Sequence, residues 1–292
     1  MASLPRPLWY KSDPDPLDIQ FQFTSPFSTN DDGNNNTPSQ RRKRRSFLHQ
    51  LDRFLTLLQG THSHLKKHTF LSGNFAPVSE EHVLAPVKIV EGSLPGGLCG
   101  AFVRNGPNPI LQMQKKRYHW FDGHAMLHTL IIKDGNYAAY TNQFIPCPRY
   151  QIEVQELGEE YFPTIGEYKG LVGLLKLTIH PYLVKEKISD VKLIAPPNTN
   201  ILMFNDKLYC LHEANLPMEC RMFPDGRLEY VGYETFNGVL DYPVSAHPVK
   251  DGEHDLIFHS YSVDEQASIN DHDVSFVTLS KKTSTSACQQ EL

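Results

Sequence analysis

Apolar residues in the first part of the chain follow a helical period. In SFLHQLDRFLTLLQG, residues 46–60, the apolar side chains recur every three or four positions, which predicts an amphipathic helix. Ser46 is a suitable N-cap for this helix and Gly60 a suitable stop. We therefore assign residues 46–72 to an amphipathic helix and its linker.

From about residue 98 the pattern becomes that of strands. Short apolar or alternating runs are separated by tight-turn sequences, among them Asp134-Gly135, Asn205-Asp206 and Asp251-Gly252. Repeated hairpins without intervening helices predict an all-β meander, which forms a sandwich, a barrel or propeller blades. One run breaks this pattern, because GLVGLLKLTIHPYLVKEK, residues 170–187, is mostly apolar and predicts a short apolar helical insertion. This insertion either faces lipid or caps a sheet.

The two ends of the chain are polar. Residues 1–45 are rich in turn formers and charge, include the basic run RRKRR at 41–45, and are expected to form a disordered basic N-terminal segment. The final stretch LSKKTSTSACQQEL is small and polar, and we assign residues 265–292 to a divergent polar tail. A basic run ahead of an amphipathic helix suits binding to an anionic membrane surface. Two alternatives stay open: the helix packs on its own domain beside a solvated basic run, or the run is a nuclear-localisation signal.

The composition is that of a folded, soluble protein of one large domain or two ordinary ones. The chain has 292 residues, of which 40% are hydrophobic and 21% charged. Its formal net charge of -5 gives no reason to expect nucleic acid as a partner. Five scattered cysteines without a CxxC pair indicate reduced thiols in an intracellular compartment. No stretch reaches the roughly 18 apolar residues that a membrane-spanning helix requires.

Three histidines, His247, His254 and His259, occur close together beside a tight turn. On a regular strand, residues an odd number apart face opposite sides of the sheet, so His254 and His259 are not expected to share a metal. His247 lies at the end of a preceding strand, where Pro248 removes a backbone donor and fixes the direction of the chain. A histidine in this place suits either a metal ligand or a hydrogen-bonded structural role, and the residues alone leave both open.

Five motifs occur in the order in which one enzyme family carries them. They are NFAPV (74–78), GSLPGGLCGAFVRNGPNP (92–109), YHWFDGHAMLHTL (118–130), NTNILMFNDKLYCLHEANLPM (198–218) and SAHPVKDG (245–252). Over residues 73–263 or so the chain thereby resembles the carotenoid cleavage dioxygenases, and the plant members most of all.

The resemblance implies an all-β fold, a seven-bladed β-propeller, of which residues 73–264 would form a partial, incomplete version. It also implies an enzyme, a non-haem dioxygenase that uses Fe²⁺ to add O₂ across one polyene double bond of a carotenoid or apocarotenoid, giving two carbonyl products. His247 matches an iron ligand of the family, and Glu213 matches a carboxylate that orients the ligand histidines. The family further implies a peripheral membrane surface as a partner and a plastid location, in the stroma or at a membrane, with the cytoplasm as the alternative.

The chain also departs from the family. The other three histidine ligands have no match, since His272 follows His247 too closely to come from a separate blade. We therefore expect a truncated N-terminal half that is inactive alone; the alternative is a non-catalytic apocarotenoid-binding or membrane-associated interaction fragment. In FDGHAMLH, His124-Ala125 replaces an Asp-Gly pair of the family, and Ala125 would cost stability if this position required a positive φ.

Overall fold

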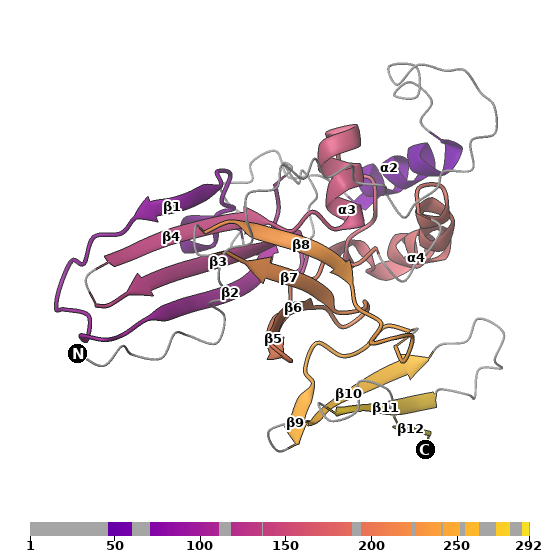
Figure 1. Cartoon of the computed structure of the whole chain (residues 1–292). Helices are drawn as coiled ribbons and strands as arrows, with labels where there is room; N and C mark the ends of the chain where they lie inside the picture. The colour runs from indigo at the N-terminus through magenta and orange to yellow at the C-terminus, as the bar shows by residue number, and fades with distance from the viewer. Residues whose placement is uncertain are drawn as a thin grey trace, which may run out of the picture.

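The computed structural model describes residues 46–59, 71–110, 118–135, 137–188, 194–223, 226–240, 242–251, 255–262, 273–280 and 288–291. The strands among these residues form three four-stranded antiparallel sheets (Figure 1). The expectation of a mostly β chain is therefore confirmed. The seven-bladed propeller stays a prediction, and the expected basic segment 1–45 lies outside the described residues.

The first sheet has the strand order β1-β4-β3-β2. Its strands are β1 (His82–Pro86), β2 (Gly100–Asn108), β3 (His124–Lys133) and β4 (Tyr137–Phe144). β2, β3 and β4 follow one another as a meander, whereas β1 pairs with the outer edge of β4. The sheet thus takes one edge strand from a segment that precedes its meander.

The second sheet is a continuous meander of β5 (Asn200–Phe204), β6 (Lys207–Leu211), β7 (Met218–Met222) and β8 (Leu228–Tyr233). Every residue of β6 after Lys207 is buried. Leu208 and Cys210 pack into the core shared with the first sheet, while Tyr209 and Leu211 pack into the core shared with the third. Because side chains alternate along a strand, one short apolar run serves both cores.

Two predicted hairpin turns are confirmed. Asn205 and Asp206 connect β5 to β6 with φ values of 50° and 61°, as a two-residue hairpin of the right twist requires. Asp134 and Gly135 follow β3 with φ values of 49° and 64°. β9 and β10, which flank the turn expected at Asp251-Gly252, are paired antiparallel, with Asp251 opposite Asp255; Gly252 lies outside the described residues.

The third sheet comprises β9 (Val249–Asp251), β10 (Asp255–Ser262), β11 (Asp273–Ser280) and β12 (Cys288–Glu291). β11 and β12 lie within residues 265–292, for which we expect a polar tail. Alternation explains the difference: Val277 and Leu279, two positions apart, are buried in the core with the second sheet. Two buried apolar side chains thus anchor β11 to the second sheet, although the segment is polar on average.

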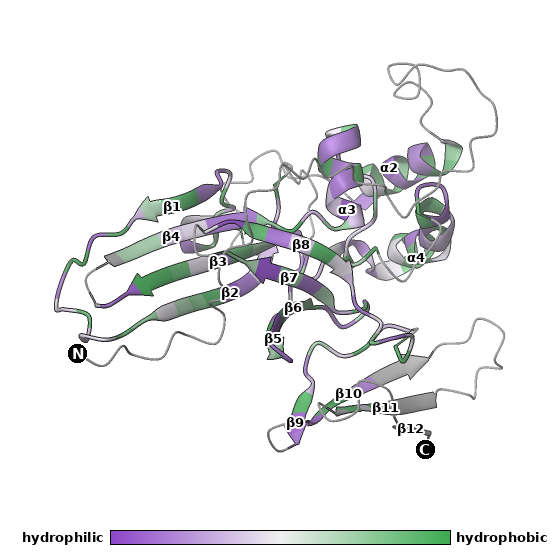
Figure 2. Cartoon of the chain, in the orientation of Figure 1, coloured by the Kyte–Doolittle hydropathy of each residue, from purple (hydrophilic) through white to green (hydrophobic). Residues whose placement is uncertain are grey.

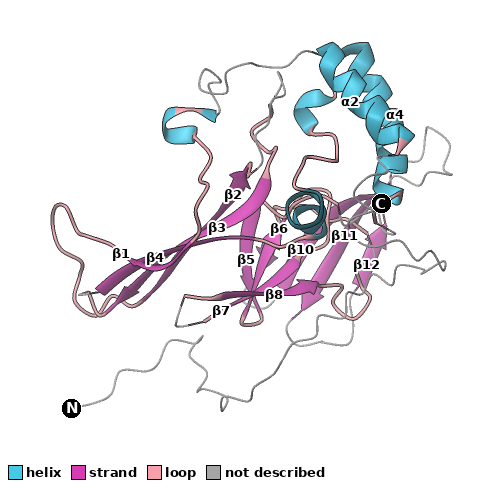
Figure 3. Ribbon diagram, turned by 90° about the horizontal axis from the view of Figure 1, so that it is seen from above, coloured by secondary structure: helices cyan, strands magenta, loops and turns pink. Residues whose placement is uncertain are grey.

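Two helices lie side by side next to the sheets (Figures 1 and 3). They are α2 (Phe47–Gln59) and α4 (Gly170–Lys185). The Ser46 hydroxyl caps α2 by accepting a hydrogen bond from the backbone N–H of His49 at 3.0 Å, as predicted. Between the sheets and α4 run the short helical segments α3 (Pro148–Tyr150), η4 (Gln151–Leu157) and η5 (Ile165–Glu167); η3 (Gly73–Phe75) precedes β1.

The contact between α2 and α4 is polar inside. Lys176 of α4 is fully buried and its Nζ lies 2.8 Å from Asp52 Oδ1, 2.7 Å from Glu167 Oε1 and 2.6 Å from Thr56 Oγ1. Gln59 adds a hydrogen bond from its side chain to the backbone oxygen of Glu167 at 2.7 Å. The buried charges of α2 and α4 therefore face each other.

The outer sides of the same helices are apolar, and both ribbons carry hydrophobic as well as hydrophilic turns (Figure 2). The apolar positions of 46–60 do not form the single packed face of a surface helix, since Leu55 is buried whereas Phe54 and Leu58 are 56% and 59% exposed. The exposed apolar side chains of the pair are Phe47, Phe54, Leu57, Leu58, Leu171, Leu174, Leu175, Leu177 and Tyr182, which we call the apolar outer face. No helix in the described part of the chain combines the length and hydropathy needed to cross a bilayer.

Candidate functional site

The segment that carries His247 is fixed by the second and third sheets. It follows β8 and leads directly into β9. The backbone N–H of Ser245 donates to the carbonyl oxygen of His259 on β10 at 2.8 Å, and the carbonyl oxygen of Ala246 accepts from the Asn200 side chain at 2.8 Å. The backbone N–H of His247 donates to the Ser245 hydroxyl at 3.0 Å. The direction in which the imidazole leaves the chain is thus set by contacts from two sheets.

Glu213 holds both this backbone and the ring itself. Its Oε2 accepts the N–H of Ala246 at 3.1 Å, and its Oε1 lies 2.8 Å from Nε2 of His247. Glu213 and His247, the two residues singled out from the sequence, are therefore in direct contact. The backbone contact from Glu213 to Ala246 spans 33 positions of the chain. Their side chains are 65% and 46% exposed for His247 and Glu213, so the pair contributes only about 0–1 kcal/mol to stability. Its effect is to orient the ring.

The contact also restricts the chemistry of the ring. A single Nε2 cannot both donate a proton to Glu213 and offer a lone pair to a metal. With Glu213 at 2.8 Å from Nε2, the ring nitrogen left for a ligand is Nδ1, unless the carboxylate moves. The side-chain contact seen here is that of an imidazole held by a carboxylate.

The neighbouring histidine, His212, is held in the neutral form. The backbone N–H of Ala214 donates to its Nδ1 at 3.0 Å, which places the ring proton on Nε2. Burial lowers the pKa of His212 to about 4, against the opposing charge of Glu213. His212 is thus an uncharged residue that directly precedes Glu213 in the chain.

The other histidines of the cluster do not complete a metal site. His259 meets the His247 segment through its backbone oxygen, and His254 and His272 lie outside the described residues. Within the described ranges there is no group of three or more His, Cys, Asp or Glu side chains arranged to hold a metal ion. The described residues therefore do not fit a four-imidazole iron centre by themselves, because they supply one imidazole at this place. Cys99, Cys147, Cys210 and Cys220 are free thiols.

A second cluster of charged residues, centred on Glu153, is not apparent from sequence alone. Glu153 is fully buried and accepts from Arg149 Nε at 2.9 Å and from the backbone N–H groups of Tyr161 and Phe162 at 2.9 and 2.8 Å. Burial raises its pKa, but the charge of Arg149, the contact with His124 and the hydrogen bond from the backbone of Phe162 outweigh burial and hold the pKa well below the usual range. The four-residue spacing of Arg149 and Glu153 is the one sequence signal that could have indicated the pair.

His124 joins this cluster, with its Nε2 3.1 Å from Glu153 Oε2. His124, at which the resemblance leads us to expect an aspartate, therefore has an acidic partner in the fold. Ala125 is fully buried within β3 and is not among the residues with positive φ, so the strain considered for it does not arise.

Comparison with known proteins agrees with this architecture. Residues 75–291 match the family described as retinal pigment epithelial membrane protein. The carotenoid 9,10(9',10')-cleavage dioxygenase 1 of Pisum sativum is 41% identical over 187 residues, which is 63% of this chain and 34% of that protein. The probable carotenoid cleavage dioxygenase 4, chloroplastic, of Arabidopsis thaliana is 33% identical over 186 residues, 62% of this chain and 30% of that one.

A solved structure shows the same fold. The cobalt-substituted apocarotenoid oxygenase of Synechocystis aligns with a TM-score of 0.53 at 22% identity, over 80% of this chain and 44% of that chain. The chain thus spans about a third of the length of the curated relatives named here. The matched residues cover most of the chain, and the chain belongs to the family of the retinal pigment epithelial membrane protein and the carotenoid cleavage dioxygenases.

Proposed function

We propose that this chain serves the oxidative cleavage of a carotenoid or apocarotenoid, in which O₂ is added across one double bond and two carbonyl products form. The observation that carries the proposal is the contact of His247 with Glu213 at 2.8 Å. Both residues lie in motifs that resemble those of the dioxygenases, and they come together from different sheet connections.

In this proposal His247 is one ligand of Fe²⁺ and Glu213 sets the orientation of its ring. Because the described residues offer one imidazole, we propose that the chain alone holds no catalytic iron and is inactive by itself. In this proposal the active species has a complete iron site, and the described residues of this chain supply one of its histidine ligands.

The described strands are consistent with a partial β-propeller. Three four-stranded antiparallel sheets pack face to face through two hydrophobic cores, as the blades of a propeller do. The number of seven blades comes from the resemblance to the family.

The apolar outer face of α2 and α4 favours a membrane surface as the source of the substrate. A carotenoid partitions into lipid, and large exposed apolar patches mark membrane or protein contacts. Leu171 and Tyr182 are 83% and 62% exposed while Lys176 on the same helix is buried, which is the reverse of a helix in water. A plastid location follows the relative named chloroplastic, with the cytoplasm as the alternative.

The same outer face also supports the second candidate, a non-catalytic apocarotenoid-binding or membrane-associated interaction fragment. It differs from the first in needing no metal. The two candidates therefore separate on the role of the His247 ring.

A segment exchange tests the proposal. Residues 198–251 are placed into the Pisum sativum dioxygenase in place of the matching segment, and cleavage of an apocarotenal is followed by chromatography of the products. We expect the exchanged enzyme to keep activity and bound iron, and His247→Ala to abolish both. The exposed Lys250 supplies the control, because Lys250→Ala in the same segment should leave both unchanged.

If the exchanged enzyme keeps its activity when His247→Ala is introduced, His247 is not an iron ligand. Stoichiometric iron in the purified chain, together with cleavage of the apocarotenal, would refute its proposed inactivity alone.

A further inference from the structure

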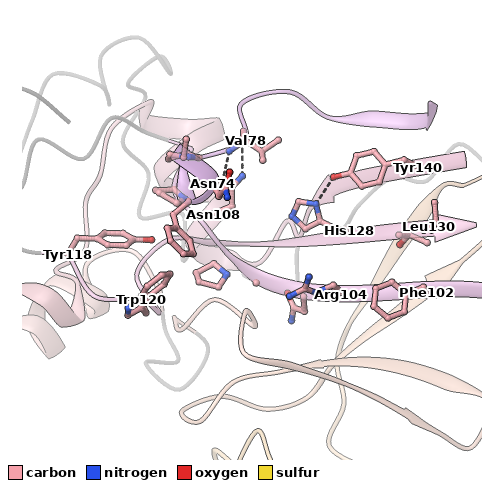
Figure 4. Close-up of a pocket in the computed structure, with 18 residues that line it drawn as sticks. Asn74, Val78, Phe102, Arg104, Asn108, Tyr118, Trp120, His128, Leu130 and Tyr140 are labelled. Carbon is pink, nitrogen blue, oxygen red and sulfur yellow. Dashed lines mark hydrogen bonds between the residues drawn. The ribbon is translucent and has the colours of Figure 1, made fainter. Parts of the chain in front are cut away.

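A cavity of about 540 Å³ opens over one face of the first sheet (Figure 4). Its floor is formed by β2, β3 and β4, and its walls by residues 74–78 together with Tyr118 and Trp120. None of its lining residues belongs to the Glu213–His247 site. The opposite face of the sheet is the one that packs against the second sheet through Leu127 and Ala125. The cavity is therefore separate from the candidate metal position.

The walls of the cavity are held in place. Asn108 at the end of β2 accepts the N–H of Val78 at 2.9 Å and donates to the oxygen of Val78 at 2.7 Å, so the segment 74–78 is fixed to the sheet. Phe75 and Trp120 meet edge to face with ring centroids 4.9 Å apart. Two aromatic rings from different segments thus form one apolar wall.

The floor carries a polar group and a cation. His128 Nδ1 lies 2.6 Å from the hydroxyl of Tyr140, from which it accepts or to which it donates according to its tautomer. Burial, together with the charge of Arg104 opposite it in the β2–β3 register, lowers the pKa of His128, so this ring is neutral. Among the described residues that line the cavity Arg104 is the one charged side chain, and no carboxylate lines it.

We propose that this cavity binds a flat, mostly apolar molecule that ends in a carboxylate. The aromatic wall of Phe75 and Trp120, with Phe102, packs against the apolar body, and Arg104 pairs with the carboxylate. The His128–Tyr140 pair offers a further hydrogen bond from a neutral group. The volume lies within the range of roughly 300–1,000 Å³ common for small-molecule sites.

The charge of the lining selects this ligand class over a neutral one. An unpaired guanidinium beside an apolar wall gains most from an anion, because Arg forms two parallel hydrogen bonds with a carboxylate. Among the described residues Arg104 forms no ion pair that would compete for this role.

The test uses 2-naphthoate and its neutral analogue 2-acetylnaphthalene as probes with the full chain at pH 7.5. The chain has two tryptophans, so the indole N–H resonance of Trp120 is assigned by comparison with Trp9→Phe and followed by NMR. We expect saturable chemical-shift changes of the Trp120 indole N–H with 2-naphthoate. Arg104→Gln should weaken the affinity for 2-naphthoate about tenfold and change the affinity for 2-acetylnaphthalene less than about twofold.

Arg221→Gln is the matched control, since Arg221 pairs with Glu229 on the second sheet, outside the cavity, and naphthoate binding should be unchanged. Melting temperatures of the variants establish that each is folded. Equal binding of both probes, or an Arg104→Gln variant that binds naphthoate like the unmodified chain, would overturn the proposal. So would Trp120 shifts that depend on protein concentration and not on probe, because a second copy of the chain would then occupy the cavity.

Discussion

Lys176 Nζ lies 2.8 Å from Oδ1 of Asp52, with the ammonium fully buried in the contact between α2 and α4. Glu167 and Thr56 complete its surroundings. Removing one partner of a buried pair leaves the other charges without compensation.

We therefore expect Lys176→Met to lower the free energy of unfolding by about 3–5 kcal/mol, measured by chemical denaturation. The exposed Lys185 of the same helix provides the comparison, and Lys185→Met should change the free energy by less than about 0.5 kcal/mol. Equal stabilities of the two variants would show that α2 is not held by the buried charges.

The contact of Glu213 with Ala246 predicts a local effect of substitution. Glu213→Ala removes the acceptor of the Ala246 N–H, so hydrogen exchange at this amide should become at least about fivefold faster. Glu213→Gln keeps an oxygen in the same place and should preserve most of the protection. If both variants exchange as slowly as the unmodified chain, Glu213 does not fix the segment of His247.

The outer face of α2 and α4 predicts binding to lipid vesicles. Leu171 and Leu174 are 83% and 58% exposed, so replacing both by Asp should abolish flotation with vesicles at little cost in stability. Val231→Asp, at a 51% exposed position of β8, should leave flotation unchanged. Equal loss in both variants would indicate a general effect of charge.

Two histidines predict the pH dependence of stability. Burial lowers the pKa of His212 and of His180 to about 4, from an ordinary value of 6.5. Between these values the unfolded chain binds protons that the folded chain does not, so stability falls as the pH is lowered from about 6.5 to 4. His212→Gln and His180→Gln should each reduce the slope of the free energy of unfolding over this range. An unchanged slope in both would contradict the neutral state of these two partly buried rings.

Much of the β architecture was open to prediction because its signals are local. Asn205-Asp206 and Asp134-Gly135 suit the positive φ that tight hairpins require, and Ser46 suits a helix cap. The contact of His247 with Glu213 was open to prediction only through the family resemblance, since no local spacing joins them.

Other features depend on partners distant in sequence. Periodicity assigns the apolar positions of 46–60 to one face, whereas the buried charge of Lys176, 120 positions from Thr56, decides which side of α2 packs inward. Strands β11 and β12 likewise depend on the edge that β10 offers for pairing. The Glu153 cluster combines groups from β3, α3 and the loop before α4, and no single stretch of sequence contains them all.

Strand β6 separates two hydrophobic cores, and each of its faces packs into a different one. Leu208 and Cys210 belong to the core shared with the first sheet, and Tyr209 and Leu211 belong to the core shared with the third. Unfolding of β6 would expose both hydrophobic cores to water together, so we expect the three sheets to unfold cooperatively and not one after another. Heating should therefore show a single unfolding transition for the β portion, and a substitution such as Tyr209→Ala should weaken the first sheet as well as the third.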